Sequence, residues 1–449
     1  MKPLRVLLIT RECLRTDSNE GNVLLNLFAG QPVALANLYC KPGLPDTDAC
    51  EAYFQLTDRM ALDNLLHRTP MGRQVSPQRE EKTAAQDAFP GKSAAPVPAG
   101  QAAEAENKAF YDFFRVHNGT LFHMAREWLW ALADFRSPAL QAFVLGFAPD
   151  VIFAPLCYSR FVLAVHRYVI GLAGVPAVTY LYDDLYSLRQ FSLSPLFWLH
   201  RFAQRRAIRK TLPFFRYAYT MTPQQANEYA RMLPLPMRLL RKGADVTPAG
   251  EPAPHEGVRL IYAGGIYFGR DRTLAAVADT VRALRREGLA VQLDLYTSSP
   301  LTKAVRQKLA DGDGCTVHPA VPFAELAQRY RESDVALHVE SFRSKDALVT
   351  RLSFSTKIVD CLGSGCAVLA VCPAINAGWQ YLKEEDAAVC VATEDGIPAA
   401  VRALAGDPAL REAYAQKALA CLTRNHDGDK IRRGLLSDLQ ELASGRGAL

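Results

Sequence analysis

One stretch of the chain, residues 340–370, reads ESFRSKDALVTRLSFSTKIVDCLGSGCAVLA. It leaves an apolar strand at Glu340, crosses a polar loop, enters a helix and then runs into a second apolar strand. The early turns of that helix carry Ser355, Thr356, Lys357 and Asp360. Short, continuous apolar runs that alternate with helices are typical of a parallel sheet covered on both faces. The stretch therefore predicts one repeat of an α/β domain.

The same alternation extends in both directions along the chain. In the second half, apolar strands are expected at 258–265, 291–297, 315–321, 334–340 and 366–372. In the first half, they are expected at 4–10, 33–40, 149–155, 175–183 and 217–223. The Pro- and Gly-rich segment VTPAGEPAPHEG, residues 246–257, is typical of a hinge. Two α/β arrays joined by a hinge predict a ligand cleft between the carboxyl ends of two facing sheets.

Length and composition fit this organisation. The chain has 449 residues, of which 49% are hydrophobic and 22% charged, so we expect two folded domains. The predicted domains are residues 1–248 and 256–423, with a carboxyl-terminal helix at 424–449 that could pack back on the first domain. Residues 69–109 are rich in Ala, Pro, Gln and Glu, and we expect a disordered insertion there.

Charge and cysteine content narrow the class of protein. The net charge of +6 is mild, and without an aromatic-interleaved basic module it favours an acidic substrate or an anionic membrane surface over nucleic acid. The ten cysteines contain no CxxC pair, which argues against a zinc site or a disulfide framework. The DGDG motif at 311–314 has the composition of a turn, so we expect no metal ion there.

The amino-terminal run MKPLRVLLIT breaks at Arg11 and Glu12, too early for a signal peptide, and it predicts a buried first strand. No later run reaches the roughly 18 apolar residues of a membrane span. The sequence therefore predicts a cytoplasmic protein.

The helix that follows residue 354 has the chemistry of a phosphate site. Backbone amides and the dipole at a helix start favour anions, and Lys357 adds a mobile positive charge. One turn on, Asp360 can accept hydrogen bonds from a ribose diol. The alternative is that Lys357 and Asp360 only solvate a helix face.

Residues 356–370, TKIVDCLGSGCAVLA, resemble the end of the donor site in retaining glycosyltransferases of the GT-B fold. The similarity is greatest to family 4 and its relatives in capsule, lipopolysaccharide, exopolysaccharide and teichoic-acid assembly. The resemblance implies two Rossmann-like domains facing each other across a cleft. It also implies that Asp360 binds the nucleotide ribose, and that Glu340 lies near the sugar and diphosphate. Glu340 and Asp360 stand further apart than the family's two acids, which predicts a longer loop between them.

A second motif, YAGGIYFGRDR at 262–272, follows an expected strand. Gly264 and Gly265 let the backbone approach a ligand closely, and Arg270 or Arg272 can neutralise a diphosphate. The alternative is a two-glycine turn with no phosphate.

The acceptor side rests on two segments at strand ends of the first domain. In LYDDLY, residues 181–186, Asp183 is the first choice to orient an acceptor hydroxyl and Asp184 the second. Capping by Asp184 is the alternative reading. In SNEGN, residues 18–22, Asn19 and Gly21 stand where the family has a loop near diphosphate and acceptor, and a simple helix cap is equally consistent.

The segment HRFAQRRAIRKTLPFFRY, residues 200–217, combines cationic and apolar side chains. Such a helix suits contact with anionic lipid headgroups, and a solvated helix face is the alternative.

Together these features predict a glycosyltransferase that moves a sugar from a nucleotide-diphosphate donor to a surface-glycan or lipid-linked acceptor. The resemblance implies retention of the anomeric centre and chemistry without a metal or other cofactor. Asp183, Glu340 and Lys357 are the expected catalytic residues, and Gly264, Gly265, Arg270, Arg272, Ser355, Thr356 and Asp360 the expected donor site. Two alternatives remain open: a nucleotide-sugar 2-epimerase, and a catalytically silent GT-B protein that binds a sugar nucleotide or a partner enzyme.

Overall fold

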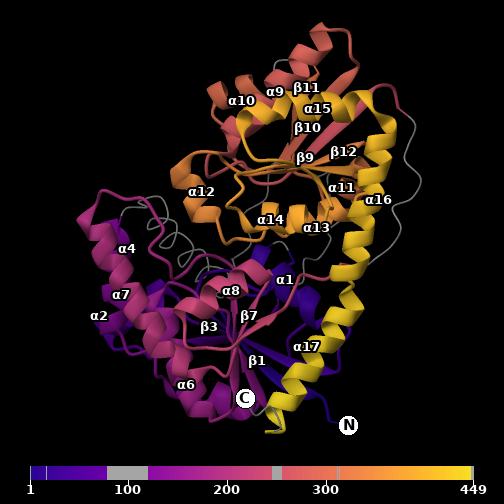
Figure 1. Cartoon of the computed structure of the whole chain (residues 1–449). Helices are drawn as coiled ribbons and strands as arrows, with labels where there is room; N and C mark the ends of the chain where they lie inside the picture. The colour runs from indigo at the N-terminus through magenta and orange to yellow at the C-terminus, as the bar shows by residue number, and fades with distance from the viewer. Residues whose placement is uncertain are drawn as a thin grey trace, which may run out of the picture.

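Two parallel sheets, each covered by helices, form the framework of this computed structural model (Figure 1). The structure describes residues 2–16, 18–77, 120–244, 255–310, 312 and 314–445, without the side chains of Asn19 and Phe323. The predicted hinge falls mostly outside the described residues, as do Asp311 and Asp313 of the DGDG motif.

Within the described residues, the first sheet has eight strands in the order β4-β3-β2-β1-β5-β6-β7-β8. The strands are β1 (Leu4–Thr10), β2 (Val33–Tyr39), β3 (Ala52–Gln55), β4 (Arg73–Val75), β5 (Val151–Phe153), β6 (Ala177–Leu181), β7 (Ala218–Thr220) and β8 (Met237–Leu239). All neighbours pair in parallel except β3 and β4. The covering helices are α1 (Asn19–Phe28), α2 (Asp58–His67), α4 (Thr120–Leu132), α5 (Pro138–Phe147), α6 (Arg160–Ala173), α7 (Pro195–Thr211) and α8 (Pro223–Met232).

The second sheet, again within the described residues, has six parallel strands in the order β11-β10-β9-β12-β13-β14. They are β9 (Val258–Ala263), β10 (Val291–Thr297), β11 (Cys315–Pro319), β12 (Val335–Val339), β13 (Ala367–Val371) and β14 (Val389–Val391). The helices are α9 (Arg270–Arg286), α10 (Lys303–Leu309), α11 (Phe323–Arg331), α12 (Ser344–Thr350), α13 (Lys357–Leu362), α14 (Ala377–Glu384), α15 (Ile397–Gly406), α16 (Pro408–Asn425) and α17 (Gly428–Ala443). The predicted α/β class with two facing Rossmann-like domains is confirmed.

Local sequence fixes where several helices begin. Helices α5, α7, α8 and α16 each start with a proline, preceded by Ser137, Ser194, Thr222 and Asp407 respectively. In each case the oxygen of that preceding side chain accepts a backbone N–H of the first turn, while proline has no N–H to leave unpaired. This pairing of cap and proline sets the entry point of the helix.

The predicted start of the insertion, at residue 69, is wrong. Residues 69–77 belong to the first domain, because β4 pairs with β3 and Met71 is fully buried. The polar composition of this segment hid a short edge strand. Residues 78–119 lie outside the described residues.

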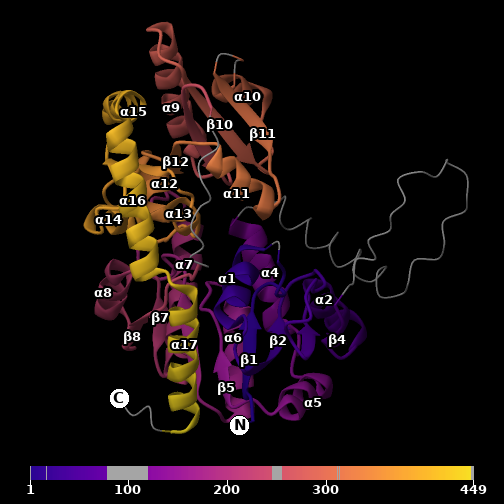
Figure 2. The same ribbon diagram turned by 90° about the vertical axis from the view of Figure 1, so that its right-hand side faces the viewer.

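Helices α16 and α17 connect the two domains. Figure 2 shows α16 running along the second domain and α17 along the first. Leu435 and Leu439 of α17 are buried, and Asp438 accepts hydrogen bonds from Tyr219 of β7 and Arg238 of β8. Where the two helices meet, the buried ring of His426 contacts Tyr381 and the backbone carbonyl of Lys242.

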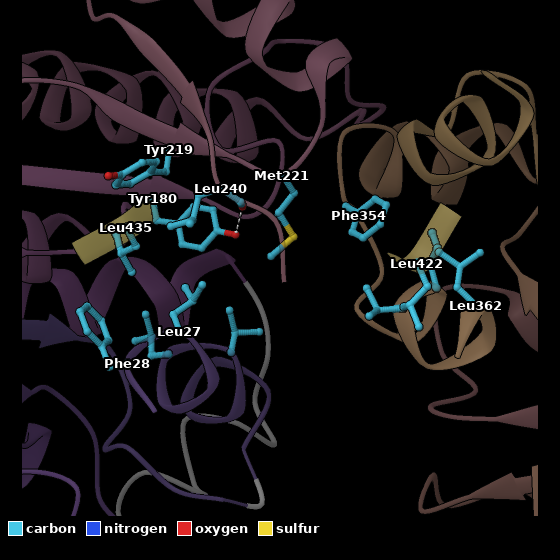
Figure 3. Packing of buried hydrophobic residues seen from close by; sticks show 14 of the residues in the cluster. Leu27, Phe28, Tyr180, Tyr219, Met221, Leu240, Phe354, Leu362, Leu422 and Leu435 are labelled. Carbon is cyan, nitrogen blue, oxygen red and sulfur yellow. Dashed lines mark hydrogen bonds between the residues drawn. The ribbon is translucent and has the colours of Figure 1, made fainter. Parts of the chain in front are cut away.

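One apolar cluster reaches from the first sheet through α17 to the second domain (Figure 3). Leu27, Phe28 and Leu435 pack beneath the sheet of the first domain, and Met221 lies on the side that faces Phe354 of the second. Tyr180 donates to the backbone carbonyl of Leu240 at 2.6 Å, so its buried hydroxyl is satisfied. The domains therefore share part of their core beside the cleft.

Candidate active site

A cavity of about 390 Å³ lies between the two domains, where the carboxyl ends of both sheets face each other. Its walls come from segments that directly follow β1, β6, β9 and β12, together with the start of α1 and of α13. Its polar lining includes Glu12, Glu20, Asp183, Arg270, Glu340, Ser355, Thr356 and Lys357. Glu12 and Glu20 were not predicted as site residues. The other six residues of this set were predicted from the sequence, and the fold brings them to one cleft.

Lys357 brings a positive charge to this cavity. It begins α13, and its Nζ lies 5.8 Å from the centroid of the Tyr262 ring. It forms no ion pair with any residue that the structure describes. Burial, and then the charge of Arg270, lower the pKa of Lys357 to about 8. An anion in the cleft would supply the countercharge that Lys357 lacks.

Gly264 makes room for this lysine. A Cβ atom at position 264 would stand 1.9 Å from Nζ of Lys357, and Gly264 has a φ of 154°. Both the space and the backbone conformation therefore favour glycine. The following Gly265 forms the turn, because its carbonyl accepts hydrogen bonds from Tyr262 and Arg270.

Arg270 and Glu340 form a buried bidentate ion pair. Nη2 and Nε of Arg270 donate to the two carboxylate oxygens of Glu340 at 2.6 and 3.1 Å. Arg270 is 7% and Glu340 3% exposed. The sequence predicted that Arg270 would neutralise a diphosphate, but Glu340 already compensates most of its charge. Both groups still line the cavity and present one rigid, hydrogen-bonded unit to a ligand.

Asp183 faces the cleft from the end of β6. Its carboxylate accepts a hydrogen bond from the Ser353 hydroxyl of the second domain at 2.5 Å. Although the side chain is exposed to the water of the cleft, desolvation by the surrounding protein raises the pKa of Asp183. The Asp184 charge adds to this shift, and the Ser353 hydrogen bond opposes it.

Asp184 is buried and holds the local backbone in place. It accepts hydrogen bonds from the backbone N–H and the hydroxyl of Ser187, and it contacts the guanidinium groups of Arg201 and Arg351. No helix begins at Asp184, so the helix-capping alternative is wrong, and the carboxylate instead fixes the loop at Ser187.

The two acceptor-side residues near the amino terminus lie at the start of α1. The Ser18 hydroxyl caps this helix by accepting the N–H of Gly21 at 3.1 Å. A Cβ atom at position 21 would stand 2.3 Å from the carbonyl oxygen of Arg15, so Gly21 serves close backbone packing. Asn19 is the first residue of α1, and its side chain is outside the described set.

Four predicted donor residues do not line the cavity: Gly264, Gly265, Arg272 and Asp360. Arg272 is exposed on the first turn of α9. Asp360 lies one turn beyond Lys357 and pairs with Lys242 of the first domain at 3.1 Å. The ion pair ties α13 to the segment that follows β8.

A larger cavity of about 620 Å³ continues the cleft into the first domain and shares Asp183 and Ser353 with the first cavity. Its far wall comes from α4 and α7, and the rings of His123 and His200 stack there at 6.5 Å. Burial is the main cause that lowers the pKa of both histidines. The sequence analysis missed this cavity, because helical periodicity does not show which helices enclose a space.

A set of contacts across the cleft was also missed. Arg351, which directly follows α12, pairs with Glu228 of α8 as well as with Asp184. Beside it, the amide of Gln225 donates to the backbone carbonyl of Leu352 at 3.2 Å. These contacts and the Asp183–Ser353 bond join the two walls of the cleft. A polar loop was expected at 341–354, and no local pattern marks Arg351.

Within the described residues, no group of three or more His, Cys, Asp or Glu side chains is arranged to hold a metal ion. No helix in the described ranges is both long and apolar enough to span a bilayer. The ten cysteines are free thiols, and Cys361, Cys366 and Cys372 are buried.

Comparison with known proteins agrees with this architecture. A family model described as glycosyl transferase-like matches residues 272–437, which form most of the second domain. No curated protein matches the chain by sequence.

Solved structures match nearly the whole chain at low sequence identity. Sucrose-phosphate synthase from Thermosynechococcus elongatus is 13% identical with a TM-score of 0.63, covering 98% of this chain and 100% of its own. A trehalose-6-phosphate protein from E. coli, bound with UDP-2-fluoro glucose, is 13% identical with a TM-score of 0.57, covering 97% and 99%. The UDP-forming α,α-trehalose-phosphate synthase from Burkholderia xenovorans, in complex with glucose-6-phosphate, is 11% identical with a TM-score of 0.57, covering 97% and 100%. The chain therefore has the GT-B fold.

Proposed function

We propose that the protein is a glycosyltransferase that uses a nucleotide-diphosphate sugar as its donor. The observation that carries this proposal is Lys357, a cation without an acidic partner in the described chain. Its side chain lines the interdomain cavity in the space that Gly264 leaves free. Its surroundings favour an anionic ligand, and the domain that carries it matches the glycosyl transferase-like model. The E. coli protein of the same fold was solved with a nucleotide sugar bound.

On the donor side, Lys357 and the adjacent Ser355 and Thr356 would bind the diphosphate. The buried Arg270–Glu340 pair would position the sugar and share its hydrogen bonds. Asp360 would hold the ribose beside its partner Lys242. Because charge develops on the leaving diphosphate, fixed cations in a partly dry cleft stabilise the transition state without a metal ion.

On the acceptor side, Asp183 would orient the attacking hydroxyl. Its position between both cavities supports this role, since a sugar in the smaller cavity and an acceptor in the larger one would meet beside it. The relative from Burkholderia xenovorans holds a sugar phosphate. For this chain we propose a glycan or lipid-linked acceptor of surface-polysaccharide assembly, transfer with retention as in family 4, and work at the cytoplasmic face of the plasma membrane.

The proposal is tested with a panel of UDP-, GDP-, CMP- and dTDP-sugars. A donor that binds the native state should raise its melting temperature by mass action. With that donor and an acceptor mixture, the wild type should release free nucleotide and form a glycosylated product. Lys357→Ala should melt cooperatively but lose at least a hundredfold in turnover, in the range seen when one charge-stabilising group is removed.

Three outcomes separate the alternatives. Isomerisation of the donor sugar with no acceptor present would identify a 2-epimerase. A thermal shift without hydrolysis, isomerisation or transfer would identify a silent binding protein. Unchanged turnover in Lys357→Ala would refute the role given to this lysine.

A further inference from the structure

Helix α4 presents an apolar stripe to solvent. Leu121, Trp128 and Leu132 are 65%, 62% and 67% exposed, and Ala125 between them is exposed as well. The spacing 121, 125, 128 and 132 places these residues on one face of the helix. The opposite face contributes the buried side chains Glu127 and Trp130 to the fold. In a surface helix of a globular protein, the apolar stripe normally faces the core and the polar side chains face water.

Helix α7 continues this surface. Leu196, Leu199 and Phe202 are 40%, 59% and 53% exposed along its first half, and Phe191 and Leu193 just before it are 60% and 87% exposed. One turn after Phe202, the exposed stripe becomes cationic. Exposed residues there are Arg206, Arg209 and Lys210.

The two helices lie side by side on the outer edge of the first domain (Figure 1). His123 of α4 stacks on His200 of α7, and one groove is lined by Ala131 and Ala207, so the helices run in parallel. Each exposed stripe lies opposite the buried face of its helix. The stripes therefore form one surface, the α4–α7 face, composed of Leu121, Trp128, Leu132, Leu196, Leu199, Phe202, Arg206, Arg209 and Lys210.

The charge of this surface has one sign. Between Asp184 and Glu228 the chain contains no Asp or Glu but seven basic residues, Arg189, Arg201, Arg205, Arg206, Arg209, Lys210 and Arg216. Arg205 and Arg209 contact Tyr186, and Arg201 is buried beside Asp184. Arg206 and Lys210 have no acidic partner within the described chain, so their charges are available to an outside anion.

A groove at this face is lined by cationic side chains. It has a volume of about 290 Å³ between α4, α6 and α7, with Trp130 and Phe161 in its apolar wall. Its cations are Arg160, Arg167, Arg206 and Lys210. Its one carboxyl, Glu127, accepts the backbone N–H of Arg160, and burial raises the pKa of Glu127. The groove therefore offers a phosphate several cations and almost no competing negative charge.

We propose that the α4–α7 face docks on an anionic phospholipid bilayer. Its Leu, Phe and Trp side chains would enter the interface, and Arg206 and Lys210 would bind lipid phosphates at the groove. Apolar and cationic residues on one exposed surface are the combination that interfacial helices use. A symmetric contact between two copies would bring the same cations together, which disfavours self-association through this face.

The docking geometry also bears on the acceptor, and this step rests on the proposed function. The inner sides of α4 and α7 line the 620 Å³ cavity with Phe122, His123, Phe197 and His200. A face that rests on the bilayer would place the mouth of this cavity close to the lipid headgroups. A lipid-linked acceptor could then enter between the two helices without leaving the membrane.

The experiment is cosedimentation of the full chain with phosphatidylcholine vesicles and with vesicles containing phosphatidylglycerol. The wild type should bind the anionic vesicles and release them as salt is raised. Trp128→Ser/Phe202→Ser and Arg206→Gln/Lys210→Gln should each weaken binding about tenfold or more. The matched control Arg306→Gln/Lys308→Gln removes the same charges from exposed positions on α10 and should bind like the wild type.

A second readout locates the contact. Brominated phospholipids should quench tryptophan fluorescence of the wild type, and most of this quenching should disappear in Trp128→Phe.

The proposal would be overturned if the wild type does not bind anionic vesicles. It would also be overturned if the α10 control variant weakens vesicle binding as much as the variants of the α4–α7 face do. Dimerisation that Trp128→Ser abolishes, or exposure of the face only after residues 78–119 are deleted, would assign the surface to another occupant. Thermal shifts by nucleotide sugars are independent of these results, so a failure here leaves the transferase proposal standing.

Discussion

At the scale of single residues, two of the cations that line the cleft differ in their electrostatic surroundings. Arg270 has a buried carboxylate partner, whereas Lys357 has no carboxylate at ion-pair distance among the described residues and lies 5.8 Å from the centroid of the Tyr262 ring. Motif reading placed both near a diphosphate, and it could not tell them apart, because Glu340 lies 70 residues from Arg270 in sequence. An incoming phosphate would therefore gain more from the charge of Lys357 than from that of Arg270.

The depressed pKa of Lys357 predicts how donor binding depends on pH. Below about 8 the lysine is charged, and above it the free protein must take up a proton to bind an anion. We expect affinity for a nucleoside diphosphate to fall by up to about tenfold per pH unit above 8. Lys357→Arg, which stays charged, should remove this loss. Isothermal titration from pH 6 to pH 9.5 checks the prediction, and equal slopes for both proteins would contradict it.

The lowered pKa of Lys357 also makes the free energy of unfolding depend on pH. Between about 8 and the ordinary value of 10.5, the unfolded chain binds more protons at this site than the folded chain does. The free energy of unfolding should therefore rise with pH across this window in the wild type relative to Lys357→Met. Urea denaturation at several pH values measures the difference, which should be absent if the lysine is solvated.

The Arg270–Glu340 pair gives a further prediction. Glu340→Gln leaves a guanidinium buried with a neutral partner, so the free energy of unfolding should fall by about 3 kcal/mol. The control Glu385→Gln, which loosens the surface pair with Arg424, should change stability by less than about 1 kcal/mol. Equal effects in chemical denaturation would show that burial of the pair does not matter.

At the scale of elements, the sequence predicted the strands with long apolar runs and missed several short strands. The buried strands β1, β6, β12 and β13 were expected close to their observed positions because their apolar runs are continuous. Strands β3, β4, β8 and β14 have four residues or fewer and were missed. The equally short β5 and β7 were expected because each lies within a longer run of apolar sequence. Helix α12 was taken for a polar loop because the surrounding fold, not its own sequence, provides its buried face.

The loop that follows α12 carries the main ion pair across the cleft. Arg351 is 4% exposed and contacts Glu228 and Asp184 of the first domain. Such a contact joins residues more than a hundred positions apart and leaves no local signal. For Arg351→Ala we expect a loss of about 3 kcal/mol in the free energy of unfolding and a larger radius of gyration in X-ray scattering.

A surface ion pair serves as the control for this variant. Arg402→Ala breaks a contact with Glu287 in which both side chains are about half exposed. It should cost less than about 1 kcal/mol and leave the scattering curve unchanged. If Arg351→Ala scatters like the wild type with unaltered stability, the contact does not hold the domains together.

At the scale of the whole molecule, α16 and α17 make the two domains one structural unit. The sequence predicted a carboxyl-terminal helix at 424–449, but the contacts of α17 with α1, β7 and β8 depend on the three-dimensional path of the chain. Leu439→Ala on α17 should reduce the free energy of unfolding by about 2 to 5 kcal/mol, because Leu439 is fully buried. Leu419→Ala on α16, where the side chain is 37% exposed, should have a much smaller effect in the same denaturation experiment.

We infer that the interdomain cleft binds a nucleotide-diphosphate sugar through the charge of Lys357. The most direct test is a thermodynamic cycle by isothermal titration, with the nucleoside diphosphate of the preferred donor and its parent nucleoside, on the wild type and Lys357→Ala. We expect removal of the diphosphate to cost the wild type at least about tenfold more in affinity than it costs the variant. An equal loss in both proteins would show that Lys357 does not contact the diphosphate, and it would contradict the claim.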